Sequence, residues 1–257
     1  AMAYDGSPMR VLIPVPDADF DTTEVAVPWR LLRDAGHEVV FATEGGGTAP
    51  ACDPRLLSGV LLGQLGADPE PRRFYADLQG DRAFRTPIRW ADIDPAQLDG
   101  LILPGGHAPG MRQYLGSTLL QQKVAAFWEQ RPQCPVGAIC HGVLVLARAR
   151  RADGKSPIHD LRTTCLPRYM EHTAYLLTAW KLGAYYRTYE KYVEEEVKAA
   201  LWHGSQFVRG PIELMRRGTM TDDRPAFVVE DGRYVSARWP GDAYLFARRF
   251  IARLQGK

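Results

Sequence analysis

The sequence predicts an α/β fold in which a mainly parallel sheet is covered by helices on both faces. Short apolar runs of strand length alternate along the chain with longer segments of helical periodicity, which is typical of parallel sheets. Two of these runs, near 99–103 and 135–139, end in turns built from small residues. With 257 residues, 46% of them hydrophobic, the chain is long enough to bury a full core as one elaborated domain.

Apolar runs of strand length define the predicted sheet. The first is Val11 to Val15, and segments of other character separate each run from the next. Strands are predicted at 10–15, 38–43, 99–103, 135–139 and 162–165, followed by a hairpin at 226–229 and 233–237. Asp231-Gly232 supplies the turn of that hairpin, because both residue types tolerate a left-handed backbone.

Helical periodicity accounts for much of the remaining chain. Helices are predicted at 23–35, 117–130, 141–149, 168–182, 190–201 and 242–254. The first of them ends at Gly36, since glycine commonly follows the last turn of a helix. In the last one, Ala243, Ala247 and Phe250 share one face, as expected for a helix that packs on a core.

Two long segments exceed a minimal fold of this kind. Residues 44–97 open with three glycines and carry several prolines, which predicts a long irregular excursion. Residues 166–225 are helical in pattern and rich in tyrosine. Both leave the sheet near strand C-terminal ends, where open α/β sheets bind ligands, so we expect them to cap the site and form its pocket walls. For any single tyrosine, packing between the added helices is the simpler interpretation.

The composition argues against several classes of function. A net charge of +2 gives no general case for binding nucleic acid or a membrane surface. No apolar run reaches the length of a membrane span, so we expect a soluble, cytoplasmic protein. The scattered cysteines and histidines show no ligand spacing, which predicts neither a disulfide framework nor a metal site. Residues 1–8 are small and polar and are expected to be an expression remnant or a disordered start, leaving 9–257 as the domain.

One cysteine stands between a predicted strand and a predicted helix. Cys140 follows the run 135–139, with Ala138 and Gly142 two positions away on either side. Small neighbours at these positions are typical of a nucleophile elbow, a strained turn that presents a reactive side chain. The free N–H groups at the helix start are expected to stabilise a thiolate and lower the thiol pKa. The alternative, a buried structural cysteine, does not explain the residues around it.

A pair of glycines ends the preceding predicted strand. Gly105 and Gly106 follow 99–103, and His107 comes next. Adjacent glycines let backbone N–H groups face a cavity, as an oxyanion hole requires, and the N–H of the residue after the nucleophile, here His141, is the usual second donor. The sequence therefore predicts an oxyanion site at this turn, with His107 lining the pocket.

Together these segments resemble the DJ/PfpI superfamily, which has the class I glutamine-amidotransferase-like fold. The matching pieces are Glu24-x-x-x-Pro28 and the segments 35–39, 103–107, 138–142 and 235–238. The Pro-Gly-Gly-His turn is most similar to the heat-shock-inducible, cofactor-independent glyoxalase branch. The resemblance implies a flavodoxin-like parallel-sheet sandwich, Cys140 as nucleophile, and Glu24 as a carboxyl that hydrogen-bonds the sulfur and moves a proton. The structural alternative for Glu24 is an exposed glutamate at a helix start.

Two acids that some relatives use are missing from this chain. Where some place an aspartate after the next strand, 166–168 reads Leu-Pro-Arg, and Glu171 is the only nearby carboxylate. Where others donate a glutamate across a dimer interface, the chain has Gly110. His141 thus lacks an evident acid to orient it as a base, apart from Glu171. Asp242 is better interpreted as the cap of the last helix than as a third catalytic member.

The implied chemistry is addition of a thiolate to a small electrophilic carbonyl, without a cofactor or metal, to give a 2-hydroxy acid. The same apparatus suits a specialised hydratase, lyase or amidase, such as one that hydrates an isonitrile, with a pocket remade by the two long segments. A non-catalytic redox sensor or holdase chaperone, which only oxidises Cys140, is the alternative of another class. The resemblance also implies a homodimer. Because Gly110 replaces the donated acid, we expect each protomer to hold a complete site for its small-molecule substrate.

Overall fold

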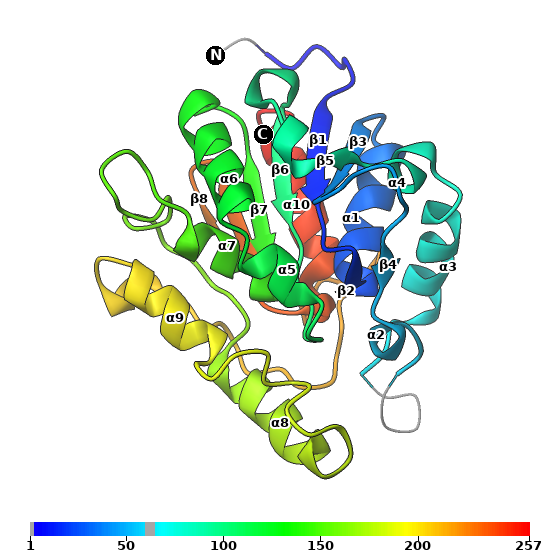
Figure 1. Cartoon of the computed structure of the whole chain (residues 1–257), viewed down its shortest axis with the longest axis vertical. Helices are drawn as coiled ribbons and strands as arrows, with labels where there is room; N and C mark the ends of the chain where they lie inside the picture. The colour runs from blue at the N-terminus through cyan, green and yellow to red at the C-terminus, as the bar shows by residue number, and fades with distance from the viewer. Residues whose placement is uncertain (1–2, 60–64) are drawn as a thin grey trace.

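The main sheet of the protein has seven strands in the order β5-β3-β1-β6-β7-β9-β8. It is seen in a computed structural model that describes residues 3–59 and 65–257 (Figure 1). Neighbouring strands are parallel except β8 and β9, which form an antiparallel hairpin at one edge. The strands are β1 (Arg10–Pro14), β3 (Glu38–Thr43), β5 (Ile88–Arg89), β6 (Gly100–Leu103), β7 (Val136–Ile139), β8 (Val228–Asp231) and β9 (Tyr234–Ala237).

Helices cover both faces of this sheet. On one face, α1 (Thr22–Asp34) packs against α10 (Ala243–Leu254) and α3 (Pro69–Leu78). On the other, α7 (Val143–Arg148) packs against α6 (Thr118–Gln130) and α5 (Met111–Leu115) (Figure 1). The central strands β6 and β7 are buried along their whole length, as strands covered on both sides must be. The predicted α/β class, with its flavodoxin-like parallel sheet, is confirmed.

The described part of 44–97 is more regular than its glycines and prolines predict. A short strand, β4 (Ala51–Cys52), pairs with β2 (Ala18–Phe20) outside the main sheet. Helices α2 (Pro54–Ser58), α3 and α4 (Arg82–Arg85), the edge strand β5 and the 3-10 turns η1 (Trp90–Asp92) and η2 (Pro95–Gln97) follow. The expectation of an irregular excursion is wrong because Pro54 and Pro69 begin helices, where proline has no N–H bond to lose.

The strand predicted at 162–165 does not form. Thr163 makes only an isolated parallel bridge with Phe207. The N–H of Thr164 is bound by the hydroxyl of Ser236 at 3.0 Å, so this buried group finds its partner without extending the sheet. Beyond it lie α8 (Arg168–Leu182), with the predicted bounds, α9 (Val193–Ala200) and the 3-10 turn η4 (Gly204–Gln206).

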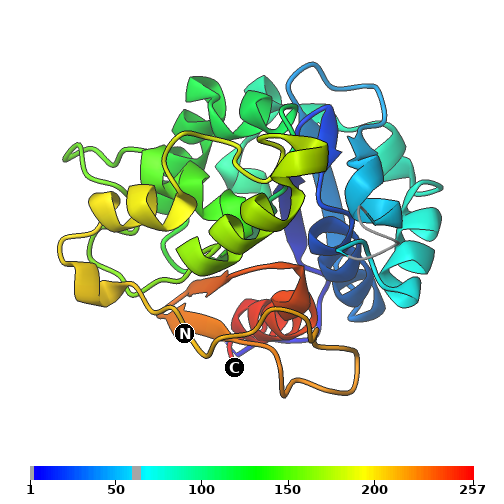
Figure 2. The ribbon, with the colours of Figure 1, turned by 90° about the horizontal axis from the view of Figure 1, so that it is seen from below.

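Helices α8 and α9 lie beyond the end of the sheet toward which β1, β6 and β7 point (Figure 1). Figure 2 shows the same end from below, with α8 and the extended chain that follows α9 drawn across it. Parallel sheets bind ligands at this edge, so the fold places the added segment where a pocket wall is needed. No helix in the described part of the chain is long and apolar enough to cross a bilayer.

Candidate active site

Cys140 occupies a strained turn between β7 and α7. Its φ is 59°, in the left-handed region that residues with a side chain seldom adopt. A 3-10 turn, η3 (Cys140–Gly142), leads directly into α7. A Cβ at Gly142 would lie 2.1 Å from the carbonyl oxygen of Leu103, at the end of β6. Only glycine fits there, and the turn has the geometry of a nucleophile elbow.

Glu24 reaches the elbow from the first turn of α1. Its side chain is fully buried, so the alternative of an exposed helix-start glutamate is wrong. Oε1 accepts a hydrogen bond from the N–H of Gly105 at 2.8 Å. A Cβ at Gly105 would lie 2.8 Å from Oε1 and 3.0 Å from the Cβ of Cys140, so the glycine lets carboxyl and thiol share one space. The other oxygen, Oε2, is buried without a hydrogen-bond partner among the described residues, and the Cys140 thiol lies beside the carboxyl.

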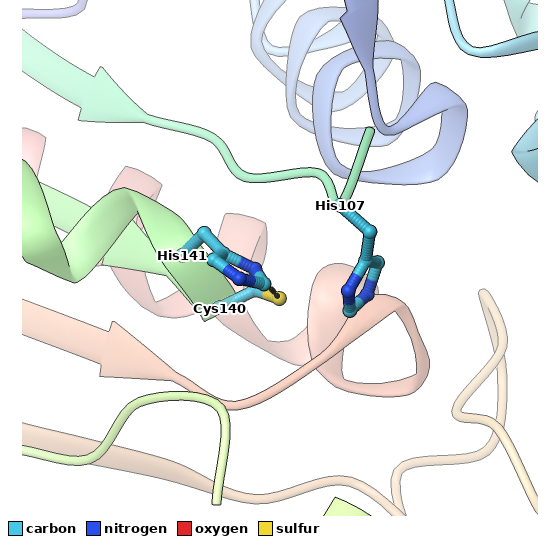
Figure 3. A group of neighbouring side chains, drawn as sticks. All are labelled: His107, Cys140 and His141. Atoms are coloured by element: carbon cyan, nitrogen blue, oxygen red, sulfur yellow. Dashed lines mark hydrogen bonds between the residues drawn. The ribbon is translucent and has the colours of Figure 1, made fainter. Parts of the chain in front are cut away.

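Two histidines complete the cluster, as Figure 3 shows. The Nδ1 of His141 lies 3.6 Å from the Sγ of Cys140. The ring of His107 stands edge-on to that of His141, with centroids 4.8 Å apart. Both residues are buried, and the Nδ1 of His107 has no partner in the described structure. No carboxylate among the described residues hydrogen-bonds His141, so these groups do not form a Cys-His-acid triad.

Burial controls the ionisation of this cluster. It raises the pKa of Glu24 well above its ordinary range, and it raises to about 6 the pKa of Asp21, which caps α1 by accepting the N–H of Glu24. It lowers the pKa of His107 to about 4 and also lowers the pKa of His141, so both rings are neutral at neutral pH. The predicted lowering of the Cys140 pKa is wrong. Burial, followed by the charges of Glu24 and Asp21, raises it and outweighs the backbone N–H of His141.

A cavity of about 210 Å³ opens beside the cluster. We call it the apolar cavity. Asp21, His107, Tyr186 and Arg217 supply its polar groups, and the rest of the lining is almost entirely apolar. Both long segments contribute apolar side chains to its wall: Leu56, Leu65, Met170, Leu177 and Met215.

Comparison with known proteins identifies the family of this chain. A family model described as ThiJ/PfpI family-like matches residues 15–211. The chain belongs to this family. It is similar to an uncharacterised protein of Schizosaccharomyces pombe, with 31% identity over 203 residues that cover 76% of this chain and 73% of the relative. It is also similar to a deglycase of Pyrococcus abyssi, with 26% identity over 96% of this chain and 100% of that protein.

The solved structure of glyoxalase III from Candida albicans has the same fold. It superimposes with a TM-score of 0.69 at 19% sequence identity, and the match covers 95% of this chain and 97% of that one. At this identity the likeness concerns the fold alone. The resemblance to the DJ/PfpI superfamily is confirmed.

Two other predicted site residues, Glu171 and Gly106, make the following contacts in this ThiJ/PfpI-like fold. The carboxyl of Glu171 accepts the N–H of Val193 at the start of α9, at 3.2 Å, and burial raises its pKa to about 8. Glu171 is not part of the lining of the apolar cavity. At Gly106, a Cβ would lie 2.7 Å from the carbonyl oxygen of Asp19, so this glycine permits a close approach of two loops.

The role expected for Asp242 is wrong. Its carboxylate makes no capping bond to the backbone of α10. Instead it accepts two hydrogen bonds from the guanidinium of Arg238, at 2.9 and 3.0 Å, and one from the N–H of Phe227 at 2.9 Å. The ion pair is buried within the loop before α10, and the hydrogen bond from Phe227 ties this loop to the segment before β8.

The sequence did not single out three polar residues of the apolar cavity. Asp21 had a usable signal, because an aspartate three positions before Glu24 is a helix-start pattern. Tyr186 and Arg217 lie in the long segment 166–225. No spacing distinguishes them from the many other tyrosines and arginines, and only the path of the folded chain brings them to the cavity.

The cluster also contains donors that suit a metal ion. His107, Cys140 and His141 each offer one donor atom, and these atoms all lie within 4.8 Å of one another. Imidazole nitrogen and thiolate sulfur are preferred ligands of zinc and copper ions. The sequence predicts no such set because His107 lies far from the other two along the chain. A bound thiophilic ion would occupy the sulfur and compete with its use as a nucleophile.

Proposed function

We propose that this protein is a cysteine-dependent, cofactor-independent enzyme that adds the Cys140 thiol to a small electrophilic carbonyl, as a glyoxalase or deglycase does. The observation that carries this proposal is the buried Glu24 carboxyl beside the thiol, with one oxygen that has no other partner in the described structure. Leaving such an oxygen unpaired is costly, and a structural cysteine does not require it. The relatives named as deglycase and glyoxalase III support the same class.

The first step is attack of the sulfur on the aldehyde carbon of a 2-oxoaldehyde. Because burial raises the pKa of Cys140, the thiol loses its proton as the S–C bond forms. The Nδ1 of His141 lies 3.6 Å from Sγ, so we assign His141 on this distance as the group that takes the proton. The carbonyl oxygen becomes an oxyanion and takes the proton that His141 received, which gives the hydroxyl of a thiohemiacetal and restores the neutral imidazole.

The oxyanion needs donors that the resting site leaves available. The N–H of Gly105, one of the predicted donors, already binds Glu24. The N–H of His141 points toward the Cys140 sulfur, beside which the oxyanion forms. We therefore assign the oxyanion to the backbone N–H groups of His141 and Gly106.

Glu24 then moves one proton. Its carboxylate takes the proton from the carbon that bears sulfur and returns it to the neighbouring carbon. The hydroxyl proton of the thiohemiacetal passes to the neighbouring carbonyl oxygen in the same conversion, which gives the thioester of a 2-hydroxy acid. A raised pKa suits a carboxyl that must accept and return a proton near neutral pH. Water then cleaves the C–S bond, releasing the 2-hydroxy acid and restoring the thiol. The net reaction adds one water to the substrate and requires no electron acceptor.

A second candidate is a hydratase or lyase that uses the same cysteine on a larger, apolar substrate. The observation that favours it is the apolar cavity, whose volume of about 210 Å³ and apolar lining exceed what a three-carbon carbonyl needs. The two candidates share the nucleophile and differ in substrate size.

Turnover of methylglyoxal to lactate tests the proposal. We expect Cys140→Ser to abolish it and Glu24→Gln to lower kcat/KM by at least about a hundredfold, the usual scale for a general acid–base group. Cys134→Ser is the matched control, because this thiol is only partly buried and lies outside the cluster. Undiminished turnover in Cys140→Ser would contradict the proposal. Turnover of phenylglyoxal or an isonitrile, with none of methylglyoxal, would favour the second candidate.

We also propose that each protomer holds a complete site, whether or not the protein dimerises. A Cβ at Gly110 would lie 2.5 Å from Oδ2 of Asp19, so this position has no room for the acid that some relatives supply there. Activity per protomer is expected to stay constant on dilution while light scattering follows the oligomeric state. A fall in activity that tracks dissociation would show that the site is shared.

A further inference from the structure

A second cavity, of about 310 Å³, shares His107 with the apolar cavity and has a different lining. Three arginines from separate parts of the chain face it: Arg55 of α2, Arg112 of α5 and Arg187 from the loop after α8. Its lining includes no carboxylate from the described part of the chain. We call it the arginine cavity.

The three guanidinium groups are held in place by aromatic rings and backbone oxygens. Arg55 lies over the ring of Tyr185 at 4.9 Å, and Arg112 lies over Tyr189 at 5.3 Å. Arg112 also donates two hydrogen bonds to the carbonyl oxygen of Thr188, at 2.7 and 3.2 Å. Such contacts orient a guanidinium and leave its positive charge in place.

These three arginines differ from a neighbouring arginine that has an acidic partner. Arg148 lies over the same ring, Tyr189, at 4.4 Å, and is paired with Glu196 at 2.6 Å. Arg55, Arg112 and Arg187 form no ion pair with any described residue, and the Nε of Arg187 is buried without a hydrogen-bond partner.

The Asp53 carboxylate lies behind the cavity wall beside Arg55, and the buried carboxyl of Glu171 lies near Arg187. Asp53 accepts hydrogen bonds from the hydroxyl of Tyr185 and from the backbone N–H of Arg55. Its charge offsets part of the repulsion, but it is engaged away from the open space.

We propose that the arginine cavity binds the anionic group, phosphate or carboxylate, of a small-molecule ligand. Guanidinium groups recognise both kinds of oxyanion through paired N–H donors. The positive charges of the three arginines repel one another across the cavity. An anion bound between them is attracted to all three, and this attraction offsets the repulsion.

The arginine cavity connects to the cysteine cluster through one short path. The hydroxyl of Thr188 donates to the carbonyl oxygen of His107 at 2.6 Å, and the carbonyl oxygen of Thr188 is held by Arg112. An anion that draws Arg112 toward itself therefore acts on the residue that lines both cavities. Binding itself does not depend on the proposed function. Only an effect of binding on turnover would.

The test is a calorimetric titration of the full-length protein at constant ionic strength, once with inorganic phosphate and once with sodium lactate. We expect saturable, one-to-one binding of at least one anion, and a Kd raised about tenfold or more by Arg55→Gln, Arg112→Gln or Arg187→Gln, since hydrogen bonds between charged groups are the strong ones. Arg85→Gln, at an exposed arginine of α4, is the matched control and should leave the Kd unchanged.

The relative affinities for the two anions identify the class of ligand. Preference for phosphate identifies a phosphorylated ligand, and preference for lactate identifies a carboxylate ligand. Arg55→Gln is the most informative variant, because this residue is exposed and its side chain makes no hydrogen bond to another described residue. No saturable binding of either anion, or equal weakening in Arg85→Gln and Arg55→Gln, would overturn the proposal. Because binding is measured without turnover, failure here is distinct from failure of the proposed function.

Discussion

The elbow and the wall of the apolar cavity differ in how tightly they are packed. At the elbow, a single added carbon at Gly142 or Gly105 would approach its neighbours to 2.1 or 2.8 Å. In the wall, Leu177 and Met215 are 61% and 67% exposed. The first region holds a few reacting atoms in one arrangement, and the second tolerates changes of shape. We infer that the elbow determines whether the chemistry occurs and that the wall determines which substrates enter.

The largest effect is expected from a methyl group added at the elbow. In Gly142→Ala, the new Cβ would lie 2.1 Å from the carbonyl oxygen of Leu103, and neither backbone segment can move away easily. We expect a loss of more than about 3 kcal/mol in the free energy of unfolding, the upper end of the usual range for overpacking. Urea denaturation of the purified variant measures it.

Gly204→Ala is the matched control for this prediction. A Cβ there meets no atom of the described residues within 4 Å, so the free energy of unfolding of this variant should match that of the wild type. If Gly142→Ala were as stable as Gly204→Ala, the elbow would not be as tightly packed as described.

The next effect comes from the buried cap of α1. Burial raises the pKa of Asp21 from its ordinary value of 3.8 to about 6, so the folded state holds this proton at pH values where the unfolded state has lost it. Its ionisation therefore costs stability as the pH rises from about 4 to about 6, by up to about 3 kcal/mol. Asparagine can cap a helix without this cost.

The measurement is the stability of Asp21→Asn relative to wild type across that pH range. The difference in free energy of unfolding should move in favour of the variant as the pH rises. Asp94→Asn, at an exposed aspartate that caps η2, is the control for losing a capping carboxylate outside the site. A variant that instead loses stability relative to wild type with rising pH would show that the Asp21 carboxylate is favoured in the folded protein.

The smallest effect separates the wall from the elbow. Met215→Ala shortens a side chain of the apolar cavity, and we expect kcat/KM to fall about tenfold for phenylglyoxal, the usual scale for losing a few apolar contacts. Methylglyoxal, which does not fill the cavity, should change little. Met220→Ala is the control, because Met220 is exposed and lies outside the lining. Equal losses on both substrates would place Met215 in the chemistry and undo the division between the two regions.

The elbow could be predicted from the sequence, and the residues of the cavity wall could not. The turn at Cys140 and the glycines beside it could be predicted because a strained elbow demands small residues at fixed local positions. Tyr186 and Arg217 could not, since their places depend on how a long segment folds back across the sheet. The direction of the Cys140 pKa was also beyond the sequence, because it depends on burial and on carboxyls brought from α1.

Two errors in the predicted fold each have an identifiable structural cause. Prolines that read as breaks in 44–97 begin helices at Pro54 and Pro69. The run 162–165 contains two threonines, a residue type that favours strands, yet the hydroxyl of Ser236 takes the N–H of Thr164 that a neighbouring strand would have bound. In the first case the place of each proline at a helix start decided the outcome. In the second case a side chain of β9 decided it.

The central claim is that Cys140 attacks the carbonyl and Glu24 moves the next proton. The most direct test is rapid acid quenching of the enzyme during methylglyoxal turnover, followed by peptide mass spectrometry. We expect an adduct with the mass of one methylglyoxal on the Cys140 peptide, accumulating in Glu24→Gln because the proton transfer is blocked, and absent from Cys140→Ser. Adducts found only on arginine and lysine peptides, in equal amounts in both variants, would contradict the account.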